Sequence, residues 1–176
     1  MCLARPPLID RTRAAVEYGE VARHLAIGLK YGRKIALAKA MARYMAPLLE
    51  GTNRDVLLIP VPLHRWRVAG RGFNQSLLMA RELARLTGVE VAPRLLRRKR
   101  ATPPLKGMSF SQRRKTVAGA FRTIGDCGGR SVVLIDDVLT TGSTAEACAR
   151  SLKRAGAARI ELLCWSRVVR NPIFER

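Results

Sequence analysis

Aromatic residues are scarce in this chain and make up 5% of its 176 residues. This scarcity argues against an extensive platform of aromatic side chains for base stacking, so any nucleic-acid binding should be electrostatic. No run of about 18 apolar residues occurs, and the start MCLARPPLIDRTR has no apolar segment of signal-peptide length. We therefore expect a cytoplasmic protein without a membrane-spanning helix.

Cysteines are few and widely spaced: Cys2, Cys127, Cys148 and Cys164. They form no CxxC pair, so neither a zinc site nor a disulfide framework is predicted from them. The pattern fits a reducing compartment.

Acidic residues are also scarce, with 13 Asp and Glu against 33 Lys and Arg, a formal net charge of +20. Such a charge concentrates polyanions near the surface, which favours nucleic acid or a phosphorylated ligand as partner. The alternative is that the charge serves solubility or reflects an arginine-rich source organism.

The composition favours an α/β fold in one compact domain. Hydrophobic residues make up 48% of the chain, and they are mainly Ala, Leu and Val, which suit helices packed on a sheet. The apolar spacing predicts a strand at 13–18, helices at 21–29 and 35–45, a buried strand at 55–61, a helix at 74–88 and a strand at 89–91.

Residues 94–115 form a basic segment with nine Lys or Arg, interrupted by Pro103, Pro104 and Gly107. We interpret residues 94–118 as a mobile basic loop rather than as part of the core. Single-stranded DNA is predicted to bind there. The rival hypothesis is that its charges close over a pyrophosphate.

The last third of the chain predicts a βαβ unit. Ser131–Ile135 is a continuous apolar strand, Ser143–Ala155 a helix and Ile160–Cys164 a second strand. The two strands should therefore be parallel, with a right-handed crossover.

Asp136 and Asp137 follow the first of these strands, and the polar loop Thr140, Thr141, Gly142, Ser143 and Thr144 follows them. Ligands bind at such carboxyl ends in open α/β sheets. Gly142 permits close backbone approach, and the new helix offers free N–H groups and its positive dipole end to a phosphate. The carboxylates would repel a phosphate, so they should face hydroxyls or a metal, as a ribose next to its 5'-phosphate would provide.

Two structural readings of the same residues remain open. The acidic pair could simply end the strand, and Ser143 with Glu146 could form a capping box that stabilises the helix without any ligand.

The segment from Val132 to Thr144, VVLIDDVLTTGST, resembles the binding signature of the type I phosphoribosyltransferases. The resemblance implies a parallel central sheet flanked by helices, with a hood-like segment over residues 1–50 and the core over residues 51–176. It further implies that Asp136 and Asp137 hold the ribose hydroxyls of phosphoribosyl pyrophosphate and, indirectly, Mg²⁺. Residues Thr140 to Thr144 would wrap the 5'-phosphate.

PVPLHR (60–65) and RGFNQS (71–76) resemble the ComF/GntX competence branch of this fold, over nearly the whole chain. The resemblance implies a pyrophosphate loop formed by Pro62, Leu63, His64, Arg65 and Arg71. A lone histidine such as His64 is more often a structural hydrogen-bonding residue than an acid or base. Trp66 could stack on a base or anchor the core.

Arg98, Lys99, Arg100 and Thr102 resemble the flexible basic loop of that branch. Leu105 and Thr116 replace its usual Gln and Asn, which weakens any recognition that depends on those amides. Only the last ligand of the branch's zinc ribbon has a counterpart, Cys2, so no structural zinc is predicted.

Three functions fit these residues. The first is a binding protein for natural transformation, with single-stranded DNA and a DNA-uptake helicase as partners. The alternative is an active Mg²⁺-dependent phosphoribosyltransferase of nucleotide salvage or purine metabolism. A third is a regulator that uses the ligand as a signal.

Overall fold

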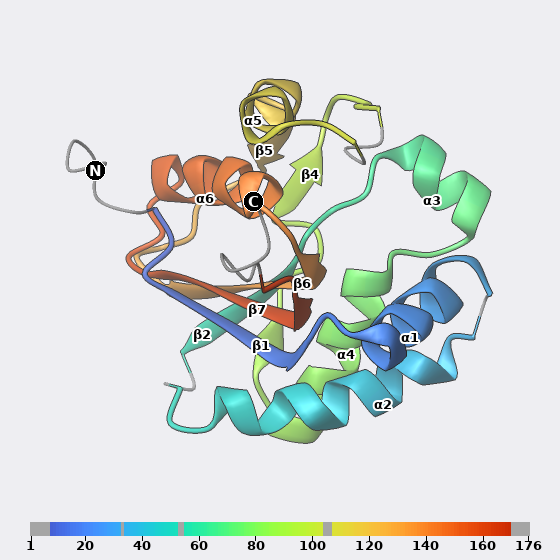
Figure 1. Cartoon of the computed structure of the whole chain (residues 1–176). Helices are drawn as coiled ribbons and strands as arrows, with labels where there is room; N and C mark the ends of the chain where they lie inside the picture. The colour runs from blue at the N-terminus through green and yellow to red at the C-terminus, as the bar shows by residue number, and fades with distance from the viewer. Residues whose placement is uncertain (1–7, 33, 53–54, 104–106, 170–176) are drawn as a thin grey trace.

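A five-stranded parallel sheet lies at the centre of the molecule (Figure 1). The structure is a computed structural model that describes residues 8–32, 34–52, 55–103 and 107–169. The strands lie in the order β1-β7-β6-β2-β3. Their bounds are β1 Arg11–Glu17, β2 Val56–Pro60, β3 Glu90–Val91, β6 Ser131–Leu139 and β7 Ile160–Arg167. The predicted parallel pairing of β6 with β7 is confirmed.

Helices cover both faces of this sheet (Figure 1). One face packs against α1 (Glu20–Tyr31), α2 (Ala36–Met45) and α4 (Gln75–Thr87), and α2 continues into a 3₁₀ turn, η1 (Ala46–Leu49). The other face packs against α6 (Ser143–Arg154). Successive residues of a strand point to opposite faces of the sheet, and both faces are covered. The continuous apolar strands are therefore buried on both sides.

The basic segment is more ordered than the sequence suggested. It contains β4 (Leu96–Arg98) and helix α5 (Phe110–Val117), and β4 pairs antiparallel with β5 (Phe121–Thr123). The interpretation of residues 94–118 as a loop outside the core is therefore wrong for β4 and α5. Leu96 and Val117 are buried with α6, so apolar residues between the charges attach the segment to the domain.

Strand β6 is longer than predicted. It continues through the acidic pair to Leu139, because β7 also extends to Arg167 and pairs with it. Asp136 and Asp137 are therefore fixed by the sheet itself and do not follow its end.

The segment after β2 contains a short helix, α3 (Arg65–Arg71), where a longer loop was expected. Gly72 ends it with a φ of 87°, in the left-handed region that favours glycine. Residues 61–64 alone remain a loop between β2 and α3.

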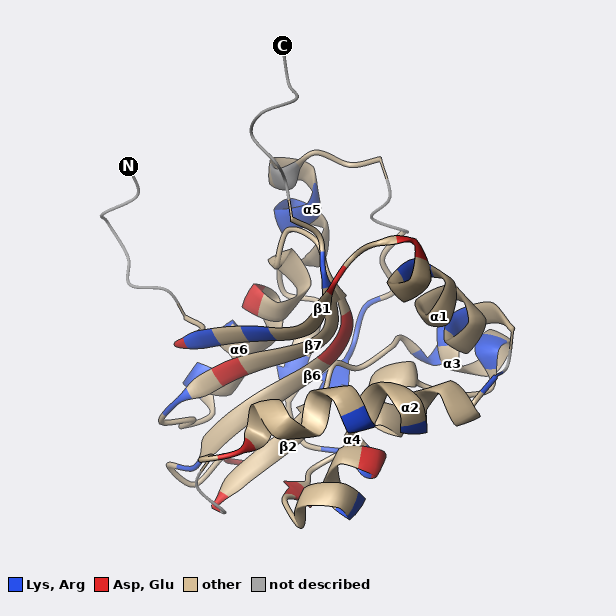
Figure 2. Cartoon of the chain, turned by 60° about the horizontal axis from the view of Figure 1, so that its bottom comes forward, with Lys and Arg blue, Asp and Glu red and all other residues tan. Residues whose placement is uncertain are grey.

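Charge is unevenly distributed over the elements. Figure 2 shows red at the carboxyl end of β6 and blue on α1, α3 and α5. No helix among the described residues is long and apolar enough to cross a membrane.

Candidate functional site

The two adjacent carboxylates at the carboxyl end of β6 form the centre of the candidate site. Asp137 is buried and Asp136 is half-buried. Asp136 Oδ1 accepts hydrogen bonds from the Asp137 backbone N–H at 2.9 Å and from Ser76 Oγ at 3.3 Å. Asp137 Oδ1 accepts from the Val138 N–H at 2.8 Å. These bonds fix the orientation of both carboxylates.

Lys30, near the end of α1, forms an ion pair with the acidic pair. Its Nζ lies 2.5 Å from Asp137 Oδ2, and about a quarter of its side chain is exposed. Burial acts to lower the pKa of Lys30, but the charge of Asp137 and the hydrogen bond to it outweigh burial and raise that pKa. Lys30 therefore stays charged and partly neutralises the site.

Burial and then the charge of Asp137 raise the pKa of Asp136 to about 7. Lys30 and the hydrogen bond from Ser76 act in the opposite direction but do not offset the rise. Two neighbouring carboxylates in a desolvated place do not both ionise readily. Near neutral pH, Asp136 can therefore either accept or donate a hydrogen bond.

The polar loop turns directly into α6. Gly142, with a φ of 73°, is the N-cap, and no side chain caps the helix. The capping box between Ser143 and Glu146 is therefore not formed, since Ser143 is already the first helical residue. Its Oγ lies 3.0 Å from Thr141 Oγ1 instead. The hydroxyls and the first N–H groups of α6 surround a small pocket whose lining includes Asp136 and residues 138–145.

Helix α5 is connected to this loop by one side chain. Arg113 donates from Nη1 to Thr140 Oγ1 at 3.0 Å and from Nε to the Met108 carbonyl at 2.9 Å. The guanidinium thus places a positive charge beside the loop, where an anion would lie.

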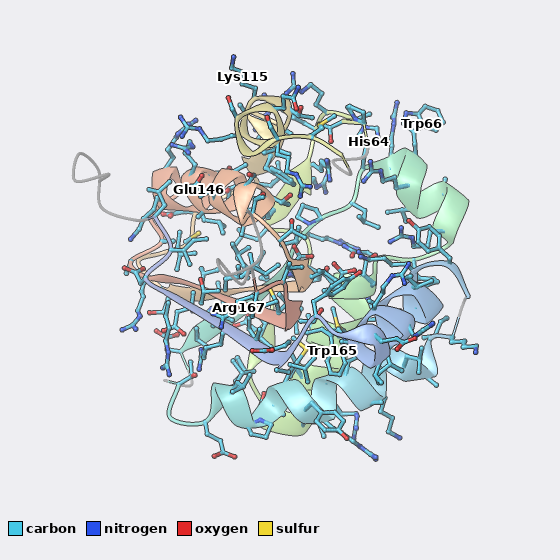
Figure 3. The ribbon with its side chains drawn as sticks, viewed as in Figure 1. His64, Trp66, Lys115, Glu146, Trp165 and Arg167 are labelled. Carbon is cyan, nitrogen blue, oxygen red and sulfur yellow. The ribbon has the colours of Figure 1, made fainter. Side chains whose placement is uncertain are left out.

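The predicted pyrophosphate loop lies between β2 and α3 (Figure 3). His64 is buried, and its Nδ1 accepts the Trp66 N–H at 3.4 Å as the N-cap of α3. Arg71 donates to Gln75 at 2.6 Å and stacks over Tyr31 at 5.1 Å. Both side chains therefore have structural contacts in addition to their predicted role. Pro62 and Leu63 are half-buried.

Trp66 is 67% exposed, which rules out the core-anchor alternative. The Arg65 guanidinium lies 5.2 Å from its ring centroid. Its exposed ring remains a candidate for stacking.

Among the residues predicted for the flexible basic loop, Arg98 and Arg100 make contacts within the protein, whereas Lys99 is exposed. Arg98 is half-buried, stacks over Phe121 at 5.2 Å and donates to Thr102 Oγ1, and burial lowers its pKa. Arg100 donates to the carbonyls of Thr116 and Ala118 at 3.0 and 2.9 Å. Lys99 is exposed. Arg98 and Arg100 thus hold this segment together.

No motif indicated Lys30, and Ser76, the last residue of the RGFNQS motif, was not assigned to the site. Their partners lie 107 and 60 positions away along the chain, so no local spacing relates them. A charged residue in the last turn of a helix is ordinarily explained by the helix dipole, which concealed Lys30.

No group of three or more His, Cys, Asp or Glu side chains that could hold a metal occurs among the described residues. Cys2, the predicted remnant of a zinc ribbon, lies outside them. His24, which is exposed and bonds to the Glu20 carbonyl at 3.0 Å, lies on α1 without a role in the site.

Comparisons with known proteins identify the family of this chain. The family model of the phosphoribosyl transferase domain matches residues 74–168. DNA utilization protein YhgH of Escherichia coli O157:H7 is 34% identical over 176 residues, which cover 96% of this chain and 77% of that protein. Competence protein F of Haemophilus influenzae is 28% identical over 170 residues, which cover 92% and 74%.

Among solved structures, purine phosphoribosyltransferase from Pyrococcus horikoshii covers 80% of this chain and 94% of its own, with a TM-score of 0.46 and 19% identity. The matched family segment contains the strand, acidic pair, loop and helix described above. This chain belongs to the phosphoribosyl transferase domain family, in the group that includes DNA utilization protein YhgH and competence protein F.

Proposed function

We propose that this protein binds phosphoribosyl pyrophosphate with Mg²⁺ at the carboxyl end of β6 and acts in the cytoplasm on incoming single-stranded DNA. The observation that supports the ligand best is the juxtaposition of Asp136 and Asp137 with the uncapped start of α6. Paired carboxylates suit a ribose diol, and free N–H groups with hydroxyls suit a phosphate.

In this proposal the carboxylates accept hydrogen bonds from the two ribose hydroxyls. Thr140 to Thr144 hold the 5'-phosphate, with Arg113 adding charge beside Thr140. The pyrophosphate lies along Pro62 to Arg65. The N–H groups of Leu63 and His64 donate no hydrogen bond within the described part of the chain, so they are available to phosphate oxygens.

The residues fit a Mg²⁺ ion that is held mainly by the ligand. Mg²⁺ is usually bound through one or two carboxylates together with substrate phosphates, and Asp136 and Asp137 provide two. Bound there, Mg²⁺ would neutralise charge on the pyrophosphate. Lys30 supports this arrangement because its ion pair with Asp137 holds that carboxylate in place.

The DNA part of the proposal is supported by the printed names of the relatives and by the charge of +20. Lys and Arg that neutralise phosphates give affinity without sequence preference. Exposed Trp66, between Arg65 and Arg67, can stack on one base. A DNA-uptake helicase is the protein partner that competence would require.

The alternative, an active phosphoribosyltransferase, would also need a group that activates the acceptor. His64 does not fit that role well, because it is buried and its Nδ1 caps α3. Release of pyrophosphate from the ligand, measured with a panel of bases with and without Mg²⁺, separates turnover from binding alone.

The ligand site is tested by Asp136→Asn together with Asp137→Asn. This double variant keeps side-chain size but removes the charges, so we expect at least about a hundredfold weaker binding of phosphoribosyl pyrophosphate, since two charge-assisted contacts are lost. Isothermal calorimetry with Mg²⁺ gives the dissociation constant. Glu50→Gln with Glu90→Gln is the matched control, because these two exposed acids lie at the amino-terminal ends of the strands, away from the site. An unchanged constant in the aspartate variant would reject the site.

A further inference from the structure

A basic groove lies between α5 and α6, and Ser143 is the one lining residue that it shares with the pocket of the sugar-phosphate site. It has a volume of about 420 Å³. Four cations line it, Arg114 and Lys115 from the last turn of α5 and Arg150 and Arg154 from α6. Figure 3 labels Lys115 on α5 and Glu146 on α6, one from each wall. We call it the α5–α6 groove.

The four cations of the α5–α6 groove are exposed, and none forms an ion pair within the described residues. Five other cations in this part of the chain do form ion pairs: Arg13, Lys30, Arg85 and Arg159 with one acid each, and Arg130 with two. Like charges gathered without ion-pair partners repel one another. The groove therefore presents positive potential that an external anion can neutralise.

The groove is elongated, because it follows one face of α6. Its lining residues Ser143, Ala147, Arg150 and Arg154 are spaced by four, three and four positions. At a rise of 1.5 Å per residue this face is about 16 Å long. Small residues between the cations, Ala118, Gly119, Ala147 and Ser151, leave space for a chain to approach the helix surface. This shape suits a linear anion.

One acid, Glu146, lines the groove close to Ser143 and hence to the polar loop. A carboxylate there repels phosphates, so it separates the cations at the far end of α6 from the sugar-phosphate site. The two sites would then hold different anions.

We infer that the α5–α6 groove binds the phosphate backbone of single-stranded nucleic acid, an inference that rests on the DNA part of the proposed function. The cations along α6 and at the end of α5 would contact phosphates of one strand. Its only aromatic lining residue, Phe121, is buried, so the groove offers no stacking surface for a base. Recognition is therefore through phosphates and tolerant of sequence.

The test is fluorescence anisotropy of a labelled oligothymidine with the full chain, over about 50 to 200 mM salt. Arg150→Gln with Arg154→Gln removes two contacts. The slope of log affinity against log salt should become shallower by about 1.4, at about 0.7 per contact, and affinity at 0.1 M salt should fall about 25-fold. Lys39→Gln with Arg43→Gln is the matched control, because it removes the same charge from exposed i, i+4 positions of α2 on the other face of the sheet.

The outcomes are distinct. A loss confined to the α6 variant supports the groove, and a gain in affinity with Glu146→Gln supports it independently. Equal losses in both double variants, or wild-type affinity in the α6 variant, would overturn the groove while leaving DNA binding in place. Absence of binding by the wild-type protein at low salt would overturn the groove and the DNA part of the proposed function together, but not the sugar-phosphate site. Thermal unfolding confirms that each variant is folded.

Discussion

The carboxyl end of β6 and the α5–α6 groove both border the start of α6, but they hold charge in opposite ways. At β6 the charged groups are partnered, since Lys30 pairs with Asp137 and Ser76 bonds to Asp136. In the groove, Arg114, Lys115, Arg150 and Arg154 are exposed without ion pairs in the described structure.

This difference separates two kinds of recognition. Partnered groups in a desolvated place are weakly screened by salt and depend strongly on geometry and protonation. Exposed cations are screened, and their affinity depends on salt more than on exact position. Binding at β6 should therefore respond to single atoms and to pH, whereas binding in the groove should respond to ionic strength.

The largest expected effect comes from Gly142→Val. A side chain at this position would lie where backbone N–H groups approach the phosphate, so the thermal shift produced by ribose 5-phosphate should disappear. Gly88→Val is the matched control, because Gly88 has nearly the same φ, 74° against 73°, and ends α4 away from the site. Both variants should lose similar stability from backbone strain, on the order of 1 to 2 kcal/mol. If Gly142→Val keeps the full ligand shift, the loop is only a helix start.

A smaller effect should appear in the pH dependence of stability. Asp136 has a pKa of about 7 in the folded protein and about 4 when unfolded, so the native state binds the extra proton between these values. The free energy of unfolding should therefore fall, by on the order of a few kcal/mol, as pH rises from about 4 to about 7. Urea unfolding at several pH values measures it.

Two variants sharpen this prediction. Asp136→Asn should remove this part of the pH dependence. Lys30→Gln should extend the fall to higher pH, because the charge of Lys30 acts to lower the pKa of Asp136. Identical profiles for the wild type and Asp136→Asn would show that Asp136 does not hold the proton.

The smallest effect is expected from exposed cations. Arg97 lies directly opposite Arg122 in the β4–β5 pair, and both are exposed. Like charges in this position repel, so Arg97→Gln should raise the free energy of unfolding by about 0.2 to 1 kcal/mol while slightly weakening single-stranded DNA binding. Arg122→Gln should give the same gain, and the double variant little more than either. A loss of stability in both single variants would contradict the argument.

Much of the fold followed from local pattern. The continuous apolar run at Ser131–Ile135 and the apolar face Ala145, Cys148, Ala149 and Leu152 predicted β6 and α6, because burial of that face is their main source of stability. These patterns also predicted the position of the loop Thr140–Thr144, because the loop joins β6 to α6.

Other features could not be predicted because they depend on contacts between distant residues. The ion pair of Lys30 with Asp137 needs α1 to lie across the end of β6. Arg98 and Arg100 were predicted to lie in a flexible basic loop, yet Arg98 packs on Phe121 and Arg100 donates to carbonyls at the end of α5. The extension of β6 through two aspartates needs β7 as its hydrogen-bonding partner.

The hydrogen bond from Arg113 to Thr140 has a consequence for regulation. Arg113 precedes Arg114 of the groove and contacts the loop proposed to hold the 5'-phosphate, so an anion at either place acts on the same turn of α5. Thermodynamic linkage is reciprocal. By whatever factor the sugar phosphate changes the affinity for a DNA strand, the strand must change the affinity for the sugar phosphate by the same factor. This turn of α5 would allow the metabolic supply of the ligand to set how firmly the protein holds DNA.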